Sequence, residues 1–337
     1  MLPLLKPTVP KIEMKKVIVL GGAGYFGSVL VKQLLKEGFY TVVVDDFSFG
    51  TNAADYHGNT NLEIIQSDIR NLSPNLFKDT YAVVNLVALS NDGVCDLYPQ
   101  RALDINLTGA LRAANQAKKS GVRRYLFASS CAIYGYGTQL SEDSTPSPKS
   151  HYAKLKLEAE RLLSKLGNSH FSVTFLRNGT LYGLSPKMRF DLMVNTMILS
   201  AFRDGVIKIN GTGNQWRPIT HVQDAANIFI AALRAEKRNV SGESFNVVSE
   251  NTQVQDVAKK INTLLPDTKI HFNSHEDNRS YSVENDKVKK ILGFKKVMDL
   301  EESIQAVIDA LEKNAVTDGP ESKVIDTYKK KFESILL

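Results

Sequence analysis

Short apolar runs alternate with amphipathic stretches along the first half of this 337-residue chain. Six runs have the length and composition of buried strands: 16–22, 40–46, 62–68, 81–89, 124–130 and 171–178. The stretches 25–37, 104–120 and 151–166 between them have the spacing of amphipathic helices. The apolar runs show no inside–outside alternation, which is typical of strands covered on both faces. The pattern therefore predicts an α/β fold with a doubly wound parallel sheet.

The alternation of apolar runs and amphipathic stretches changes after about Asn178. The loops lengthen there, and polar residues mix with aromatic ones. We therefore expect a sheet domain over 14–178 and a smaller α+β substrate lobe over 179–337, intertwined so that some segments of the lobe return to the sheet domain. The first thirteen residues carry three prolines and no apolar run of signal-peptide length, so we expect residues 1–13 to form a flexible tail.

Composition limits the possible functions. The net charge of +6, without a dense block of Lys and Arg, slightly favours anionic small molecules and does not indicate nucleic-acid binding. Two cysteines, Cys95 and Cys131, are too few for a disulfide framework, and no Cys/His cluster has metal-ligand spacing. We expect a cytoplasmic protein without a metal site. No apolar run reaches the roughly 18 residues of a membrane helix.

Three glycines, Gly21, Gly24 and Gly27, follow the first predicted strand. The first allows a tight turn, the second lets backbone N–H groups approach a pyrophosphate, and the third lets the helix pack closely. Asp45 ends the second strand, where its carboxylate can accept both ribose hydroxyls of adenosine and would repel a 2′-phosphate. No Arg or Lys lies between Asp45 and Gln66. The sequence therefore predicts a Rossmann-type domain that binds NAD rather than NADP.

Asp68 ends the third predicted strand. Its carboxylate could accept a hydrogen bond from the adenine amine, with Ile69 stacking beside the ring. It could equally cap the helical turn that follows. The residues alone leave both interpretations open.

Tyr152 and Lys156 lie four residues apart in a predicted helix, and so on one face of it. A phenol has a pKa of about 10. We expect the neighbouring ammonium, together with the positive charge of a nicotinamide, to lower it. Ser130 ends the fifth strand, and such strand ends face the ligand crevice of a parallel sheet. The three side chains predict removal of a proton from an alcohol while NAD takes up its hydride.

These motifs together resemble the extended short-chain dehydrogenases/reductases, in particular the nucleotide-sugar epimerases and dehydratases. The resemblance extends from Lys15 to about Leu311. It rests on the glycine triplet, the acid Asp45, the Asp68-Ile69 pair, the run S-S-x-x-x-Y-G and the Y-x-x-x-K pair. It also includes R-P-I-T-H-V-Q-D from Arg217, which is similar to the family's R-D-x-x-H-V-x-D.

The resemblance implies further binding residues. The cofactor set would be Gly21, Gly24, Tyr25, Phe26, Gly27, Asp45, Asp68, Ile69, Leu86, Val87, Ala88, Asn106, Tyr152, Lys156 and Asn178, with Asn106 fixing the backbone beside the tyrosine. The substrate set would be Ser90, Ser130, Thr180, Arg189, Asn195, Arg217 and Arg279, and its arginines suit a diphosphate. Thr180 departs from the family, in which an Asn is typical at that position. We interpret His221 as a tether for a helix start and Trp216 as a wall or packing residue.

The positions after Ser130 select the reaction in this family. Dehydratases acting at C4 and C6 carry Asp and Glu where this chain has Cys131 and Ala132, and sugar-acid decarboxylases carry that same Glu. The resemblance therefore argues against both reactions. The 3,5-epimerases carry a Cys at the position of Ala132. Because Cys131 comes one residue earlier, its side chain would face the other way, and we interpret it as a packing residue.

What remains is 4-epimerisation of a UDP-sugar through a transient 4-keto intermediate, which needs only the serine, tyrosine and lysine with tightly held NAD. A nucleotide-sugar reductase or dehydratase of the same family stays open as an alternative. So does a non-catalytic, cofactor-sensing regulator that has kept the fold. The resemblance also implies a homodimer in which helices 104–120 and 151–167 of two copies form a four-helix bundle.

Overall fold

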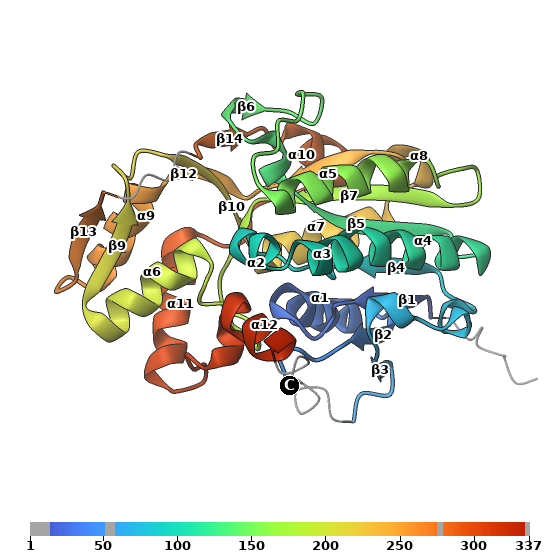
Figure 1. Ribbon diagram of the computed structural model, residues 1–337, viewed down its shortest axis with the longest axis horizontal. Helices are drawn as coiled ribbons and strands as arrows, with labels where there is room; N and C mark the ends of the chain where they lie inside the picture. Colours follow the sequence, from blue (N-terminus) through green and yellow to red (C-terminus); the bar gives the residue numbers. More distant parts are fainter. Residues whose placement is uncertain (1–13, 51–57, 275–278, 334–337) are drawn as a thin grey trace, which may run out of the picture.

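The computed structural model describes residues 14–50, 58–274 and 279–333, so the predicted tail over 1–13 lies outside the described residues. A seven-stranded sheet forms its centre, in the order β11-β7-β5-β4-β1-β2-β3, and all neighbouring strands are parallel (Figure 1). The strands are β1 (Lys16–Leu20), β2 (Tyr40–Asp45), β3 (Leu62–Gln66), β4 (Ala82–Asn85), β5 (Arg124–Ser130), β7 (Ser172–Asn178) and β11 (Ser244–Val247). The predicted α/β class and parallel sheet are confirmed.

Helices cover both faces of this sheet, because successive side chains of each strand point to opposite sides. In β5, Tyr125 and Phe127 belong to one apolar core, whereas Leu126 and Ala128 belong to the other. On the first face lie α2 (Asp92–Leu97), α3 (Pro99–Ala102), α4 (Ala110–Lys119), α5 (His151–Ser164) and α12 (Val324–Glu333). On the second face lie α1 (Tyr25–Lys36), α7 (Val222–Arg234) and α10 (Asp286–Leu292), with the short α8 (Lys237–Val240) at its edge. The sheet is therefore doubly wound, as predicted.

One helix differs from its prediction. The stretch expected to be a single helix over 104–120 begins as a π-helical segment at Leu103–Gly109 and continues as α4. Gly109 lies where an added Cβ would collide with the side chain of Ile69. Asn106 is fully buried and bonds the backbone of Leu89 instead of facing solvent. The Gly109–Ile69 contact and the Asn106–Leu89 bonds both join residues far apart in the chain, and helical periodicity does not predict such contacts.

The second lobe consists of short sheets backed by three helices. Its strands are β8 (Thr180–Tyr182), β10 (Trp216–His221) and β12 (Glu250–Gln253) in one sheet, β9 (Val206–Asn210) with β13 (Lys269–Asn273), and β6 (Gly137–Leu140) with β14 (Tyr281–Val283). The helices are α6 (Met193–Asp204), α9 (Val254–Leu264) and α11 (Leu300–Glu312), which share one apolar core with β9 and β10. The lobe is α+β in character, and β11 and α7 return from it to the large sheet.

The last described helix, α12, packs outside this lobe. It packs on the sheet domain through three aromatic or aliphatic side chains at four-residue spacing, Val324, Tyr328 and Phe332. Phe332 meets Tyr98 edge-on, with ring centroids 4.9 Å apart. The chain therefore crosses back over the sheet domain near the end of the described residues. None of the described helices combines the length and apolar character needed to cross a bilayer.

Candidate active site

A pocket of about 1180 Å³ opens where the carboxyl ends of the central strands meet the second lobe. It is larger than the roughly 300–1,000 Å³ typical of a site for one small ligand. The predicted site residues that line it are Gly21, Gly24, Tyr25, Phe26, Gly27, Asp45, Asp68, Ile69, Leu86, Val87, Ala88, Ser90, Ser130, Tyr152, Lys156, Asn178, Thr180, Arg189, Arg217 and Arg279. Asn106 and Asn195 do not line it. The pocket has room for a dinucleotide and a second ligand.

The glycine turn forms one wall of the pocket. Gly21 has a φ of 81°, a left-handed conformation that favours glycine. A Cβ at Gly27 would collide with the backbone of Gly21 and Gly22, so the start of α1 can pack against the turn only without a side chain. A Cβ at Gly24 would meet only the Gly21 carbonyl oxygen, 3.6 Å away. It would point into the space where a pyrophosphate approaches the helix N-terminus.

Asp45 lies at the far end of this wall, at the end of β2. Its carboxylate accepts backbone N–H groups of Ala23, at 3.0 Å, and Phe47, at 2.9 Å. One acid therefore fixes the glycine turn and lines the pocket at the same time. Burial raises the pKa of Asp45, and these two hydrogen bonds act against that rise. The glycine cradle and the strand-end acid fit a dinucleotide whose ribose carries free hydroxyls.

Asp68 has the capping role that the sequence left open. Its carboxylate caps the 3₁₀ turn Ile69–Asn71 by accepting the backbone N–H of Arg70 at 2.8 Å. It also pairs with the Arg70 guanidinium through both oxygens, at 2.9 and 2.7 Å. Ile69 is 5% exposed and packs against Gly109. A contact between Asp68 and adenine stays a prediction.

Ser130, Tyr152 and Lys156 converge on the pocket from β5 and α5. The Ser130 hydroxyl accepts the backbone N–H of Ala132 at 3.2 Å, which holds the turn after the strand. The ammonium of Lys156 donates to the carbonyl oxygen of Ala128 at 2.7 Å and lies 5.8 Å from the ring centre of Tyr152. Its side chain is almost fully buried. The strand end and the first two turns of α5 therefore bring the three side chains together.

The pKa of Tyr152 differs from the expectation. Burial raises it above 10, the nearby Asp92 carboxylate adds to the rise, and the hydroxyl of Ser130 lowers it. The protein groups alone therefore do not give the acidic phenol expected from the Tyr-Lys pair. Burial also lowers the pKa of Lys156, to about 8, because a buried ammonium is poorly solvated. The same desolvation acts on both groups and disfavours both charged forms.

Cys131 faces away from the pocket. It is fully buried, and its thiol donates to the carbonyl oxygen of Arg177 at 3.1 Å. Burial raises the pKa of the Cys131 thiol, so it stays neutral. Ala132, the next residue, lines the pocket. The one-residue shift has the consequence inferred from the sequence, and no carboxylate from positions 131 and 132 enters the pocket.

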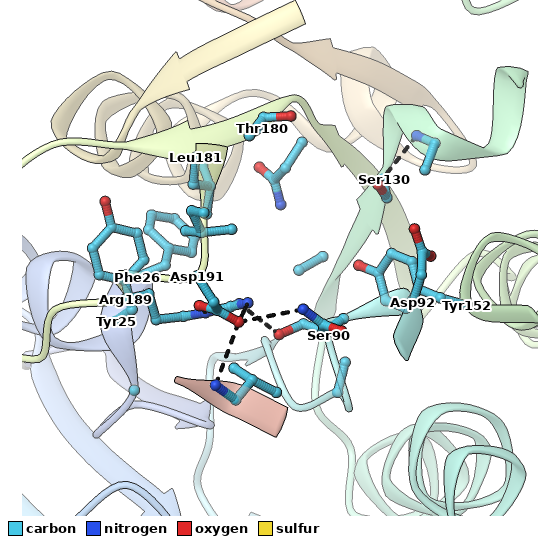
Figure 2. A pocket seen from close by; sticks show the side chains of 18 of the residues that line it. Tyr25, Phe26, Ser90, Asp92, Ser130, Tyr152, Thr180, Leu181, Arg189 and Asp191 are labelled. Carbon is cyan, nitrogen blue, oxygen red and sulfur yellow. Dashed lines mark hydrogen bonds and ion pairs between the residues drawn. The ribbon is translucent and has the colours of Figure 1, made fainter. Parts of the chain in front are cut away.

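The substrate end of the pocket contains a tight cluster around Arg189 (Figure 2). Its guanidinium binds both oxygens of Asp191, each at 3.0 Å, and donates to the Ser90 hydroxyl at 2.8 Å. Asn91 donates to Asp191 from the neighbouring loop at 3.3 Å. The cluster ties the loop after β4 to the loop after β8. Much of the arginine's charge is therefore balanced within the protein.

Asn195 and Asn106 are corrections to the sequence-based sets. Asn195 is fully buried, accepts the Gly183 N–H at 3.2 Å, and donates to the Tyr25 hydroxyl at 3.1 Å and the Arg189 carbonyl at 3.0 Å. Its polar atoms hold protein groups in place and do not reach the pocket. Asn106 likewise bonds the backbone of Leu89, at 2.7 and 3.1 Å. Both asparagines position loops from behind.

Arg217 and Arg279 lie together at the mouth of the substrate end. Arg217 is 7% exposed and donates to the Trp216 carbonyl at 2.9 Å and to the Arg279 carbonyl. The guanidinium of Arg279 pairs with Asp92 at 2.7 Å. Thr180 and Asn178 also line the pocket. Two arginines that line one pocket suit a diphosphate.

His221 and Trp216 lie outside the pocket lining. The Nδ1 atom of His221 accepts the Gln223 N–H at 3.1 Å and so caps α7, in agreement with the interpretation as a helix tether. Burial lowers the pKa of His221 to about 4, so the ring is neutral near pH 7. Trp216 is 38% exposed on β10. Neither side chain contributes to the pocket.

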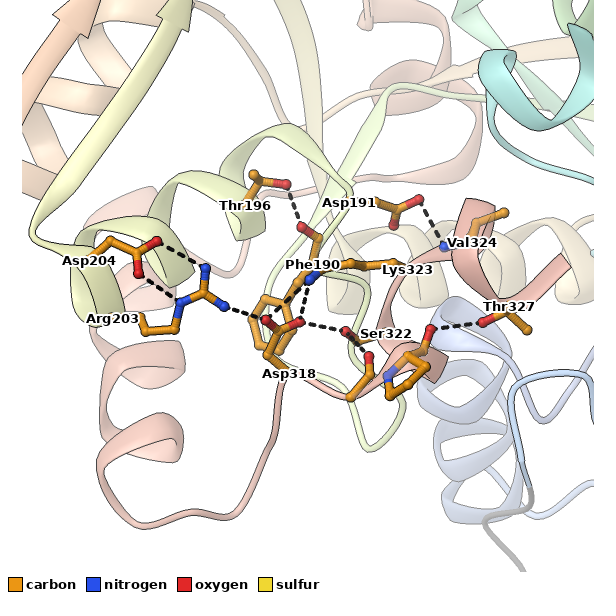
Figure 3. A network of polar contacts seen from close by, with 12 residues as sticks. Phe190, Asp191, Thr196, Arg203, Asp204, Asp318, Ser322, Lys323, Val324 and Thr327 are labelled. Atoms are coloured by element: carbon orange, nitrogen blue, oxygen red, sulfur yellow. Dashed lines mark hydrogen bonds and ion pairs between the residues drawn. The ribbon is translucent and has the colours of Figure 1, made fainter. Parts of the chain in front are cut away.

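Sequence reasoning missed several residues of the site, among them Asp191, Asp92 and two residues of α12. Asp92 lines the pocket beside Tyr152, although its position two residues after Ser90, which follows β4, could have indicated it. Val324 and Tyr328 of α12 also line the pocket, and Val324 donates its N–H to Asp191 at 3.3 Å (Figure 3). The four-residue spacing of apolar side chains predicts a helix here. It does not indicate that this helix covers a ligand site.

Comparison with known proteins identifies the family. The model described as "NAD dependent epimerase/dehydratase family" matches residues 17–248. The chain belongs to this family. The predicted resemblance and the predicted cofactor, NAD, are thereby confirmed.

Several relatives cover nearly the whole chain. A UDP-N-acetyl-alpha-D-glucosaminuronate decarboxylase from Bacillus cytotoxicus is 27% identical, over 87% of this chain and 97% of its own length. A putative UDP-glucose 4-epimerase from Methanocaldococcus jannaschii is 27% identical, over 88% and 99%. The crystal structure of UDP-glucuronic acid 4-epimerase from Bacillus cereus, in complex with UDP-glucuronic acid and NAD, has a TM-score of 0.80 and 25% identity, over 89% and 99%. The names of these proteins therefore differ in the reaction they give, and the Bacillus cereus structure contains NAD.

Proposed function

We propose that this protein is an NAD-dependent epimerase that inverts C4 of a UDP-sugar through a transient 4-keto intermediate. The observation that carries the proposal is the set of side chains after β5. Ser130, Tyr152 and Lys156 face the pocket, whereas positions 131 and 132 supply a buried thiol and a methyl group. Oxidation and re-reduction at one carbon need only the first three groups. The relative named as a putative UDP-glucose 4-epimerase supports the same conclusion.

The residues that would hold NAD are the glycine turn, Asp45 and Lys156. Gly24 leaves room for the pyrophosphate, Asp45 would accept the adenosine ribose hydroxyls, and Lys156 lies where it can bond the second ribose. Bound NAD would supply the hydride acceptor and donor. The positive nicotinamide would also favour the phenolate of Tyr152, against the desolvation that raises its pKa.

Tyr152 would exchange the proton of the sugar C4 hydroxyl, and Ser130 would hold that hydroxyl against the phenol oxygen. Lys156 would stabilise the phenolate electrostatically from the same helix face. Arg217 and Arg279 would bind the diphosphate, so that the sugar alone is free to turn over between the two hydride transfers. The four-residue spacing of Tyr152 and Lys156 in α5 keeps the base and its cation in register.

We also propose a homodimer through a four-helix bundle, in which the helix that runs from the π-helical segment Leu103–Gly109 into α4 pairs, together with α5, with its copies. Leu103, Leu107 and Leu111 support it, because these apolar side chains recur every four residues and stay only partly buried in the single chain. A cytoplasmic location remains a prediction from the cysteine content.

The test is an exchange assay on purified protein with UDP-glucose and UDP-galactose, with the products identified by NMR. We expect interconversion with no net change in NADH. Tyr152→Phe should lower turnover by about 10²–10⁴, the range of general acid–base catalysis. Tyr136→Phe is the matched control, since Tyr136 is exposed and does not line the pocket.

Other outcomes would replace the proposal. Release of CO₂ from UDP-glucuronic acid would indicate the decarboxylase reaction named for one relative. Stoichiometric consumption of NADH would indicate a reductase. NAD binding without affinity for any sugar nucleotide would indicate the cofactor-sensing regulator.

A further inference from the structure

Asp92 adds a carboxylate to the sugar end of the pocket. It is the first residue of α2, and its side chain lies beside Tyr152 in Figure 2. Asp92 is also one of the groups that, after burial, raise the pKa of Tyr152, which reflects the same proximity. A group this close to the reactive phenol would also lie close to the sugar that reacts there.

The two oxygens of this carboxylate have different surroundings. One accepts the Arg279 guanidinium at 2.7 Å. The other, Oδ1, is buried and has no hydrogen-bond partner among the described residues. A buried carboxylate oxygen without a donor costs free energy that a ligand donor can restore. Asp92 therefore presents an acceptor to whatever occupies the sugar end.

The charges around Asp92 further limit which ligand groups can bind beside it. Arg189, another cation that lines the pocket, binds both oxygens of Asp191 and the hydroxyl of Ser90. A substrate diphosphate would compete with Asp92 for Arg279. Once Arg279 turns to the diphosphate, the charge of Asp92 is less compensated. A ligand carboxylate near it would be repelled, whereas a hydroxyl or ammonium would be attracted.

We propose that Asp92 selects the sugar: its Oδ1 accepts a hydrogen bond from a hydroxyl or amino group of the bound hexose, and its charge excludes a uronic acid. This inference rests on the proposed sugar-nucleotide site and narrows its substrate to neutral or amino sugars. It separates the chain from its relative from Bacillus cereus, whose crystal structure contains UDP-glucuronic acid.

Binding to the NAD-loaded protein tests the proposal without any need for turnover. UDP-glucose, UDP-glucuronic acid and UDP would be titrated calorimetrically into the wild type, Asp92→Asn and Asp96→Asn. Asp96 is the matched control, because it lies one turn further along α2, also lines the pocket and carries the same charge. UDP lacks the sugar and so reports on the nucleotide end alone.

We expect the wild type to bind UDP-glucose about tenfold or more tighter than UDP-glucuronic acid, the scale of one charged hydrogen bond. Asp92→Asn should remove or reverse this preference. It should not weaken UDP binding, and should strengthen it if anything, since Asp92 pairs with Arg279 and its carboxylate charge competes with the diphosphate for that guanidinium. Asp96→Asn should keep the preference.

Three results would overturn the proposal: equal affinity of the wild type for the two sugar nucleotides, an equal change of preference in both variants, or loss of UDP binding in Asp92→Asn. The third would show that Asp92 maintains the structure of the pocket. Failure of the proposed 4-epimerase function can be distinguished from failure of the proposal for Asp92. If the wild type discriminates as expected but shows no epimerisation, the 4-epimerase function is wrong while the role of Asp92 stands.

Discussion

The pocket has two halves: a cofactor half around the glycine turn and Asp45, and a half proposed for the sugar around Asp92, Arg189 and Arg279. Different kinds of contact assemble them. In the cofactor half, the glycine turn and Asp45 belong to one β-α-β unit, and the backbone N–H of Ala23 in that turn donates to the Asp45 carboxylate. In the sugar half, Asp92 at the start of α2 pairs with Arg279, and Arg189 donates to Ser90, in each case between side chains far apart in the chain. A local motif therefore defines the first half, and long-range side-chain pairing defines the second.

The largest expected effect would break the cofactor half alone. Gly27→Val should remove copurifying NAD and lower the free energy of unfolding by about 1–3 kcal/mol or more, because the new side chain collides with the backbone of Gly21 and Gly22. Bound NAD would be measured by absorbance after denaturation, and stability by urea unfolding. Gly319→Ala is the control, since its Cβ meets nothing within 4 Å. Retention of NAD by Gly27→Val would show that the turn is not what admits the cofactor.

The difference between the local motif of the cofactor half and the long-range contacts of the sugar half explains how much of the site could be predicted from the sequence. Gly21, Gly24, Gly27 and Asp45 were found because a short motif dictates both their geometry and their position. Ser130, Tyr152 and Lys156 were expected at the pocket for similar reasons, from a strand end and a four-residue helical spacing, and they do line it. The alternation of strands and helices likewise predicted the doubly wound sheet and the limits of most strands and helices up to Asn178, whereas no limits were predicted after it.

The remainder depends on contacts that no local pattern encodes. Asn195 carried the right chemistry for a ligand contact, yet its atoms bond Tyr25 and the loops behind the pocket. Asp92 was overlooked because its place in the pocket depends on the start of α2 lying beside Tyr152, which is sixty residues further along the chain. The pKa of Tyr152 was expected to fall because of its charged neighbour, whereas burial, which spacing does not report, dominates.

Lys156 provides a further test of the difference between the two halves, because it lies where they meet. Its ammonium is buried, and its pKa falls from the usual 10.5 to about 8. Above pH 10.5 the lysine is neutral whether the protein is folded or unfolded, and below pH 8 it is charged in both states. Burying the charge therefore destabilises the fold fully below pH 8, and this cost disappears as the pH rises from 8 to 10.5.

Lys156→Met should consequently raise the free energy of unfolding at pH 7, by on the order of 2 kcal/mol, while abolishing turnover. The gain over the wild type should shrink steadily between pH 8 and 9.5. Urea unfolding of both proteins across this range measures it, with Lys165→Met as the control, because Lys165 is exposed at the C-terminal end of α5 and does not line the pocket. A variant that is less stable than the wild type at pH 7 would mean that the bond to the Ala128 carbonyl outweighs desolvation.

The smallest effect concerns α12, which connects the two halves. Tyr328 lines the pocket and meets Phe49 edge-on at 5.5 Å, and Val324 bonds Asp191 on the sugar side. Lys331 ties the helix to the loop after β2 through Asp46, at 2.5 Å, and Ser48, at 2.6 Å. Since Asp46 follows Asp45, this ion pair holds α12 over the adenosine end of the cofactor site.

Lys331→Met should therefore speed NAD release about two- to fivefold, in keeping with the 0–1 kcal/mol of a partly exposed ion pair, and should leave UDP affinity unchanged. Release would be followed by chasing radiolabelled NAD with excess unlabelled NAD. Lys330→Met removes the same charge from the exposed face of α12 and should match the wild type. Equal release rates in all three proteins would mean that α12 packs beside the cofactor without retaining it. Faster NAD release together with weaker UDP binding would show that the helix couples the two halves, because its contact with Asp191 would then respond to the loss of its contact with Asp46.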